Sequence, residues 1–139
     1  MTKQESPSAI LTKIIGASRT MTKVLLVGIN PSGKPFRKGC SLDKMNVWMK
    51  SLGFEYYSFS NVIPYAGEYK MKDVDTLFVK SFSNGYDKVI ALGGFASRAL
   101  SRAGVDHYTL PHPSPLNRKL NDKDYEKRVI EECREWLGA

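Results

Sequence analysis

The stretch Lys23-Val24-Leu25-Leu26-Val27-Gly28-Ile29-Asn30-Pro31 decides the fold. Residues 23–28 form a continuous apolar run that stops at glycine, which is the pattern of a strand buried on both faces. Such strands belong to parallel sheets that helices cover on both sides. After this run the chain alternates short apolar runs with helical patterns. The sequence therefore predicts an α/β fold with three layers, α/β/α, around a central parallel sheet of four strands.

The remaining elements are predicted from the same two patterns. Further strands are expected over 56–62, 88–92 and 105–110, and helices over 41–52, 72–82, 95–103 and 122–137. Ser41 is expected to cap the first helix, with Leu42 on its apolar face, and Cys133 is expected in the core. Residues 1–20 are interpreted as a tail or short helix, and 21–139 as a single domain.

Composition narrows the choice of partners. The chain has 139 residues, of which 42% are hydrophobic, and a formal net charge of +7. That size allows one real core, and the basic balance favours a polyanionic partner. Two cysteines, Cys40 and Cys133, are too few for a disulfide scaffold or a four-cysteine metal site. The apolar cluster at 10–15 is too short for a signal peptide or a membrane span. We therefore expect an intracellular protein that is not secreted, cytoplasmic or, in a eukaryote, nuclear.

Polar, glycine-rich or proline-rich loops follow each predicted strand, at 28–35, 61–65, 93–94 and 112–118. Ligands of open parallel sheets bind beyond the carboxyl ends of the strands. The last loop, His112-Pro113-Ser114-Pro115-Leu116-Asn117-Arg118, places an imidazole, a hydroxyl, a leucine and an arginine on a backbone that prolines stiffen. Such a loop suits binding and bending of a nucleic acid, although a plain strand-to-helix connection is the simpler alternative.

The first loop also nearly fits the phosphate-binding pattern G-x-x-x-x-G-K-[ST]. Pro35 stands where that pattern requires the Mg²⁺-binding hydroxyl, and Pro31 removes a backbone N–H from the phosphate cradle. Lys34 precedes a proline and is therefore pushed away from helical geometry. These three departures argue against an ATP or GTP site of this kind.

Three segments together resemble the uracil-DNA glycosylase superfamily. They are Gly28-Ile29-Asn30-Pro31, Ser60-Asn61-Val62-Ile63-Pro64 and His112-Pro113-Ser114-Pro115. The first resembles the mismatch-specific and single-strand-selective branches, and the last, followed by Leu116, resembles the second motif of the uracil-specific branch. The branch therefore stays open. The match covers about residues 23–137 and agrees in order and spacing.

The resemblance implies a uracil-DNA glycosylase-like fold and a monofunctional DNA glycosylase of base excision repair. Such an enzyme hydrolyses the N-glycosidic bond of uracil, or of a 5-substituted uracil, that has been flipped out of DNA. His112 matches the donor to the base O2, as a neutral imidazole that stabilises the departing anion. Asn30 matches the residue that holds the attacking water, and an amide there would orient the water without acting as a base. Asn61 matches the reader of the Watson-Crick edge, with a turn residue as its alternative.

The resemblance also implies contacts around these residues. The base site would include Ile29, Ser32, which stands where the uracil-specific branch has tyrosine, and Phe36, either stacking on the base or packed in the core. Leu116 would fill the gap that the extruded nucleotide leaves. Contacts to DNA are assigned to the neighbouring residues Ser114, Asn117, Arg118 and Lys119. No cofactor or metal is implied, and the expected partner of this monomer is single-stranded or mismatched DNA, not a membrane.

Two other functions fit the same residues. Because this chain is shorter than the uracil-specific enzymes, it could be a catalytically inactive nucleic-acid-binding or protein-partner module on the same fold. It could also act on a free nucleotide or nucleoside. The basic loop residues favour a polymer over a free nucleotide, unless they are simply solvated. They are Lys34, Arg37, Lys38, Arg118 and Lys119.

Overall fold

The computed structural model describes residues 22–35, 37–114 and 116–138. The proposed tail at 1–20, together with Phe36 and Pro115, lies outside the described residues. The strands are β1 (Val24–Gly28), β2 (Ser58–Asn61), β3 (Lys88–Leu92) and β4 (Tyr108–Leu110). The helices of the described part are α2 (Ser41–Ser51), α3 (Thr76–Ser83), α4 (Gly94–Arg102) and α5 (Lys123–Trp136), with 3-10 turns η2 (Met71–Asp73) and η3 (Arg118–Asn121).

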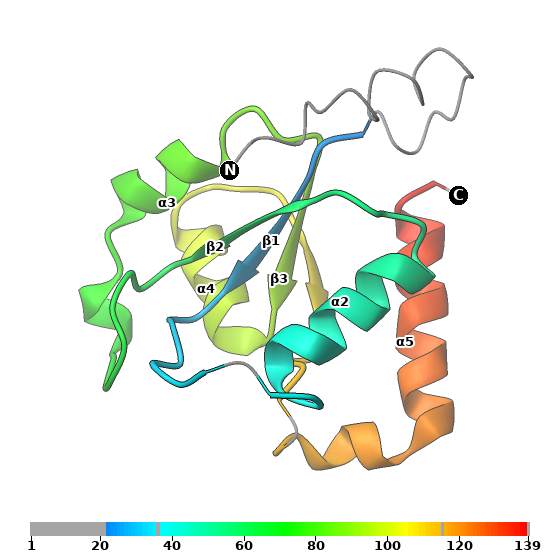
Figure 1. The fold of residues 1–139 in the computed structure, drawn as a ribbon. Helices are drawn as coiled ribbons and strands as arrows, with labels where there is room; N and C mark the ends of the chain where they lie inside the picture. Colours follow the sequence, from blue (N-terminus) through cyan, green and yellow to red (C-terminus); the bar gives the residue numbers. More distant parts are fainter. Residues whose placement is uncertain (1–21, 36, 115, 139) are drawn as a thin grey trace.

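The strands form one sheet in the order β2-β1-β3-β4, and every neighbouring pair is parallel. The predicted α/β fold with a four-stranded parallel sheet is therefore confirmed. β1 lies inside the sheet and is buried along its whole length, as its apolar run predicted. In Figure 1 the strand arrows point toward one edge of the molecule, where the connecting loops gather.

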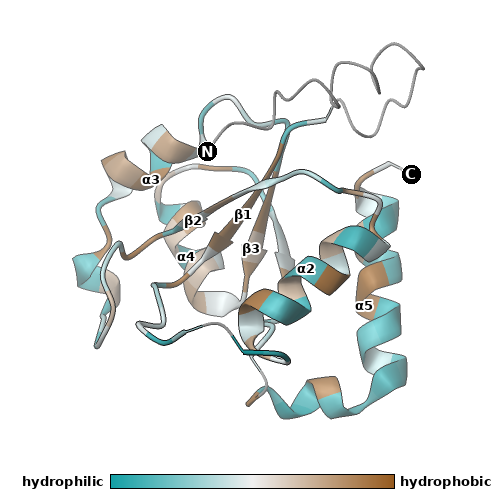
Figure 2. Cartoon of the chain, in the orientation of Figure 1, coloured by the Kyte–Doolittle hydropathy of each residue, from teal (hydrophilic) through white to brown (hydrophobic). Residues whose placement is uncertain are grey.

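Successive side chains of β1 enter two different cores. Val24 and Leu26 pack with residues of α2 and α5, whereas Leu25 and Val27 pack with residues of α3 and α4. Figure 1 shows these two helix pairs on opposite sides of the sheet, which agrees with the expected three layers. Figure 2 shows the apolar colour along β1 and β3 and a largely polar surface on α5. In the described ranges, no helix is both long and apolar enough to cross a membrane.

The first helix begins differently from the prediction. Cys40, and not Ser41, is the N-cap residue of α2. The Asp43 carboxylate accepts a hydrogen bond from Gly39 N (2.7 Å), so the residue that organises this start lies inside the helix. Leu42 is 45% exposed, and its predicted place on the apolar face is wrong. Cys133 lies in the core, as predicted.

Three other predicted elements have different bounds in the structure. Asp75 caps α3 by accepting hydrogen bonds from Leu77 N and Phe78 N, so the helix expected over 72–82 is divided into η2 and α3. The strand expected over 105–110 begins only at Tyr108, because Val105 N donates to Leu100 O of α4 (2.9 Å). The strand expected over 56–62 is likewise shorter, since β2 covers only its middle.

Glu126 connects the two helices on one face of the sheet. Its carboxylate, on α5, accepts hydrogen bonds from Trp48 Nε1 (2.7 Å) and Lys44 Nζ (3.1 Å) of α2. Burial raises the pKa of this carboxyl group, but the hydrogen bonds from Trp48 and Lys44 outweigh burial, and the pKa is lowered. The folded state therefore favours the charged form of Glu126.

We predict that Glu126→Gln lowers the free energy of unfolding by about 1 kcal/mol at pH 7. Because the folded-state pKa lies below that of an unfolded glutamate, about 4.3, the charged form contributes above that pH. Its contribution is lost as the pH falls through the folded-state pKa. Urea denaturation of the wild type and the variant, compared at neutral and acidic pH, measures both effects.

Glu131→Gln is the matched control for this experiment. Glu131 lies on the same helix and pairs with Arg134 at 2.7 Å, but its side chain is 57% exposed. An exposed pair of this kind contributes less than about 0.5 kcal/mol. Equal losses for the two variants, or a loss for Glu126→Gln that does not depend on pH, would contradict the assigned role of Glu126.

Candidate functional site

The order of the strands places a switch point at the carboxyl edge of the sheet. The chain passes from β1 to β2 on one side and then returns to β3 on the other side of β1. The loops after β1 and β3 consequently diverge, and crevices at such points are the usual ligand sites of open α/β sheets. Strands lie about 4.8 Å apart, so the four strand ends span about 14 Å. Asn61 is the last residue of β2, and Asn30 and His112 lie two residues beyond the ends of β1 and β4.

The side chain of Asn30 is held in one orientation. Its Nδ2 donates hydrogen bonds to Tyr65 O (3.2 Å) and Gly67 O (2.9 Å), in the loop after β2. The atom that faces these two carbonyl oxygens is assigned as the amide nitrogen, because an amide oxygen has no hydrogen to donate to them. Within the described residues no protein group donates to Asn30 Oδ1. Asn30 thus offers a fixed acceptor at the edge of the sheet.

Asn61 lies directly beside the end of β1. It is paired in register with Gly28, and a Cβ built on Gly28 would lie 2.9 Å from Asn61 Oδ1 and 2.9 Å from Phe59 Cζ. Real Cβ atoms do not approach other atoms this closely. The glycine that ends the apolar run is therefore needed to admit these two side chains.

His112 is positioned by the backbone on both sides of it. Ser114 N donates to His112 Nδ1 (3.1 Å), so the neutral ring carries its proton on Nε2. Burial lowers the pKa of His112, which favours that neutral form. A Cβ on Gly93 would lie 3.2 Å from His112 Cβ, and Gly93 has a φ of 93°, so glycine is required there for both space and conformation. The ring is thereby prepared as a neutral N–H donor.

The rest of the 112–119 loop is stabilised by its own hydrogen bonds. Asn117 Nδ2 donates to His112 O (3.0 Å), and Asn117 Oδ1 accepts from Lys119 N (3.2 Å), so this side chain organises the loop. Ser114 Oγ accepts from Leu116 N (3.1 Å), which leaves the hydroxyl hydrogen available to a ligand. Leu116 is 87% exposed. The loop thus presents an apolar side chain to solvent.

Several contacts connect these loops around the carboxyl edge. A Cβ on Gly33 would lie 3.3 Å from Ala66 Cβ, which places the loop after β1 against the loop after β2. The Tyr69 ring meets the Phe95 ring edge to face, with centroids 4.7 Å apart. Phe95 follows Gly93 in the first turn of α4, and Gly93 contacts His112. Contacts therefore run continuously from the Asn30 loop to the His112 loop.

Other predicted residues take less defined positions at this edge. Ile29 O extends the strand pairing by accepting from Ile63 N (2.8 Å). Ser32 is exposed, and its Oγ accepts from Lys34 N (3.1 Å) within its own turn. Arg118 and Lys119 are exposed in η3. Tyr65, Tyr69 and Phe95 were not predicted as site residues. The aromatic residues in the loop after the second strand and at the start of the helix after the third could have indicated them.

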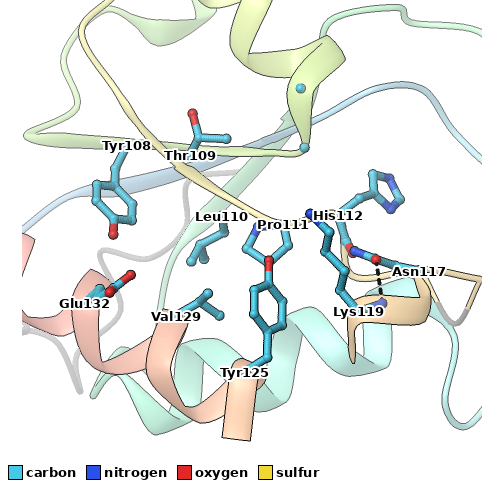
Figure 3. Close-up of a pocket in the computed structure, with 12 residues that line it drawn as sticks. Tyr108, Thr109, Leu110, Pro111, His112, Asn117, Lys119, Tyr125, Val129 and Glu132 are labelled. Carbon is cyan, nitrogen blue, oxygen red and sulfur yellow. Dashed lines mark hydrogen bonds between the residues drawn. The ribbon is translucent and has the colours of Figure 1, made fainter. Parts of the chain in front are cut away.

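A cavity of about 410 Å³ lies beside this edge, between β4 and α5. Tyr108, Pro111, Lys119, Tyr125 and Glu132 are among its lining residues. Figure 3 shows the His112 imidazole directed away from the Tyr125 ring. His112 and Asn117 also line this cavity, so it adjoins the His112 loop. Among the described residues no cluster of three His, Cys, Asp or Glu side chains could hold a metal ion.

Comparison of the chain with protein-family models, with curated proteins and with solved structures gives no match.

The two histidines are predicted to adopt opposite neutral tautomers. His112 Nδ1 accepts a hydrogen bond, whereas His107 Nδ1 faces Val105 O at 2.8 Å and must donate. Long-range ¹H–¹⁵N correlation spectra should show the proton of His112 on Nε2 and that of His107 on Nδ1. Because burial lowers its pKa, His112 should become protonated at a lower pH than an ordinary histidine. A shared tautomer would contradict this geometry, and a raised pKa of His112 would contradict its burial.

Proposed function

We propose that the protein is a monofunctional DNA glycosylase of the uracil-DNA glycosylase type, and that it releases uracil or a 5-substituted uracil from DNA. The observation that carries the proposal is His112, a neutral imidazole with its proton on Nε2 at the carboxyl edge of the sheet. In the reaction the bond between C1′ and the base nitrogen breaks, and its electron pair leaves with the base. A neutral N–H donor stabilises the charge that develops on O2 of that base.

Asn30 supports the second half of the proposed reaction. Its fixed Oδ1 can accept a hydrogen bond from a water molecule and aim the water oxygen at C1′. The sugar carbon gains the hydroxyl group, and the remaining proton passes to the departing base or to solvent. Asn61, beside Gly28, offers both a donor and an acceptor to the Watson-Crick edge of a flipped base. These residues come from three different strand ends.

The His112 loop supplies the proposed contacts to DNA. The exposed Leu116 is suited to enter the base stack at the place of the extruded nucleotide. Ser114 has a free hydroxyl hydrogen, and Arg118 and Lys119 are exposed cations that suit flanking phosphates. Asn117 would act by positioning this loop, since both ends of its amide bond within the loop.

We predict that His112→Ala lowers the single-turnover rate of uracil release by about 10² to 10³ and leaves DNA affinity nearly unchanged. The expected effect is on rate because the stabilised charge exists only in the transition state. Alkali cleavage of a uracil-containing oligonucleotide measures release, and fluorescence anisotropy measures affinity. His107→Gln is the control, because the hydrogen bonds of the His107 ring go to Ser97 Oγ and Val105 O and not to the 112–119 loop. Parallel losses of rate and affinity in His112→Ala would refute its role.

We predict that uracil bearing a 5-methyl or 5-hydroxymethyl group is also released. The uracil-specific branch has a tyrosine at the position of Ser32, and a serine there leaves room beside C5 of the pyrimidine. One added group changes recognition by only about 1 to 3 kcal/mol unless it clashes, so uracil should remain a substrate. Ser32→Tyr should selectively suppress release of the 5-substituted bases. If the wild type spares 5-hydroxymethyluracil and Ser32→Tyr changes nothing, another side chain closes this site.

A further inference from the structure

We propose that the segment 65–69 is a stacking platform for unpaired bases next to the excised nucleotide, so that single-stranded DNA is the form of substrate that the protein binds. This inference rests on the proposed function, and it names the state of the DNA that the site accepts.

The platform is formed by aromatic rings that remain exposed. Tyr65 is 48% and Tyr69 is 37% exposed, and Phe59, which meets Gly28 at the end of β1, is 41% exposed. Large rings left in solvent beside a candidate site are a feature of binding surfaces. Base-aromatic stacking is the interaction that binds single strands with little regard to sequence. In a duplex the faces of paired bases are already stacked on each other, so such rings have little to bind.

The same contacts that define the candidate site hold the platform in place. Asn30 Nδ2 bonds to the backbone of Tyr65 and Gly67, and Gly33 packs against Ala66. The Tyr69 ring is supported by Phe95 at 4.7 Å. A base stacked on this segment would therefore lie next to the residue proposed to orient the water.

Lysines that could contact phosphates flank the platform, together with acidic residues. Lys34 and Lys70 are exposed in the two loops that meet here, and Lys72 is exposed in η2. The segment itself contains one acidic residue, Glu68, which is also exposed. The neighbouring carboxylates accept backbone hydrogen bonds, Asp73 from Lys70 N at 2.8 Å and Asp75 from Leu77 N and Phe78 N, so both are oriented by the chain but keep their charge. Aromatic residues interleaved with lysines are the combination found in proteins that follow single strands.

The test measures binding to oligonucleotides that contain no uracil, by fluorescence anisotropy at fixed salt. For the double variant Tyr65→Ala/Tyr69→Ala we expect affinity for a single-stranded deoxythymidine oligomer to fall by about 100-fold, or about tenfold per ring. Affinity for a duplex of equal length should change by less than about twofold. The salt dependence of single-strand binding should stay the same, because the lost contacts are not ionic.

Three controls keep the test specific. Tyr65→Phe/Tyr69→Phe retains both rings and should retain affinity. Tyr56→Ala removes a ring that is 42% exposed before β2, toward the other edge of the sheet, and should have no effect. Tyr65→Ala alone leaves the Tyr69–Phe95 contact intact, so a loss of about tenfold there cannot come from disruption of that contact.

The outcomes separate this inference from the proposed function. A protein that releases uracil, but whose single-strand affinity does not respond to loss of the two rings, has no platform. A protein that binds single strands through these rings and never releases uracil keeps the platform and refutes the glycosylase. Equal losses on single strand and duplex, or tighter binding of a uridine ribo-oligomer than of DNA, would overturn the assignment to single-stranded DNA.

Discussion

Strand β1 has no face open to solvent, and most of the architecture follows from that constraint. Its alternate side chains need two separate cores, so helices must cover both sides of the sheet. The neighbours of β1 on both sides are parallel to it, so crossover connections must join the strands. The carboxyl ends of all four strands therefore lie at the same edge of the sheet. The loops of the candidate site meet because they all leave the sheet at this shared edge. Gly28, where this strand ends, admits Asn61 and Phe59.

A backbone N–H group and burial together favour one neutral tautomer of His112. One N–H from Ser114 fixes the tautomer, and burial lowers the pKa, so neither a carboxylate nor a metal is needed to prepare the ring. Gly93 helps to position the ring, because a Cβ there would lie 3.2 Å from His112 Cβ and its φ of 93° favours glycine. Preparation of this kind is present before a ligand binds. A donor fixed in this way needs no reorganisation when charge develops beside it.

The sequence predicted those features whose cause is local. The apolar runs of β1 and β3 are short-range patterns, and the structure has both strands near the expected positions. The errors arise where a distant or side-chain hydrogen bond competes with the pattern. Asp43 and Asp75 move helix starts, and Val105 bonds to α4 instead of extending β4. The carboxyl-edge position of Asn30, Asn61 and His112 was predictable from topology, whereas the contact of Asn30 with 65–67 was not.

The contact of Asn30 with residues 65–67 means that the side chain both holds this loop and presents an acceptor at the sheet edge. Removing the side chain would remove both at once. One end of the amide holds the loop that carries Tyr65, and the other end is left as an acceptor at the sheet edge. Under the proposed function, Asn30→Ala would therefore release both the water and the stacking segment. An aspartate would keep an acceptor but turn an oxygen toward Tyr65 O and Gly67 O, where both carbonyls repel it. The carboxamide is the side chain that serves both ends, which is a physical reason for asparagine at this position even though a carboxylate would be the stronger base.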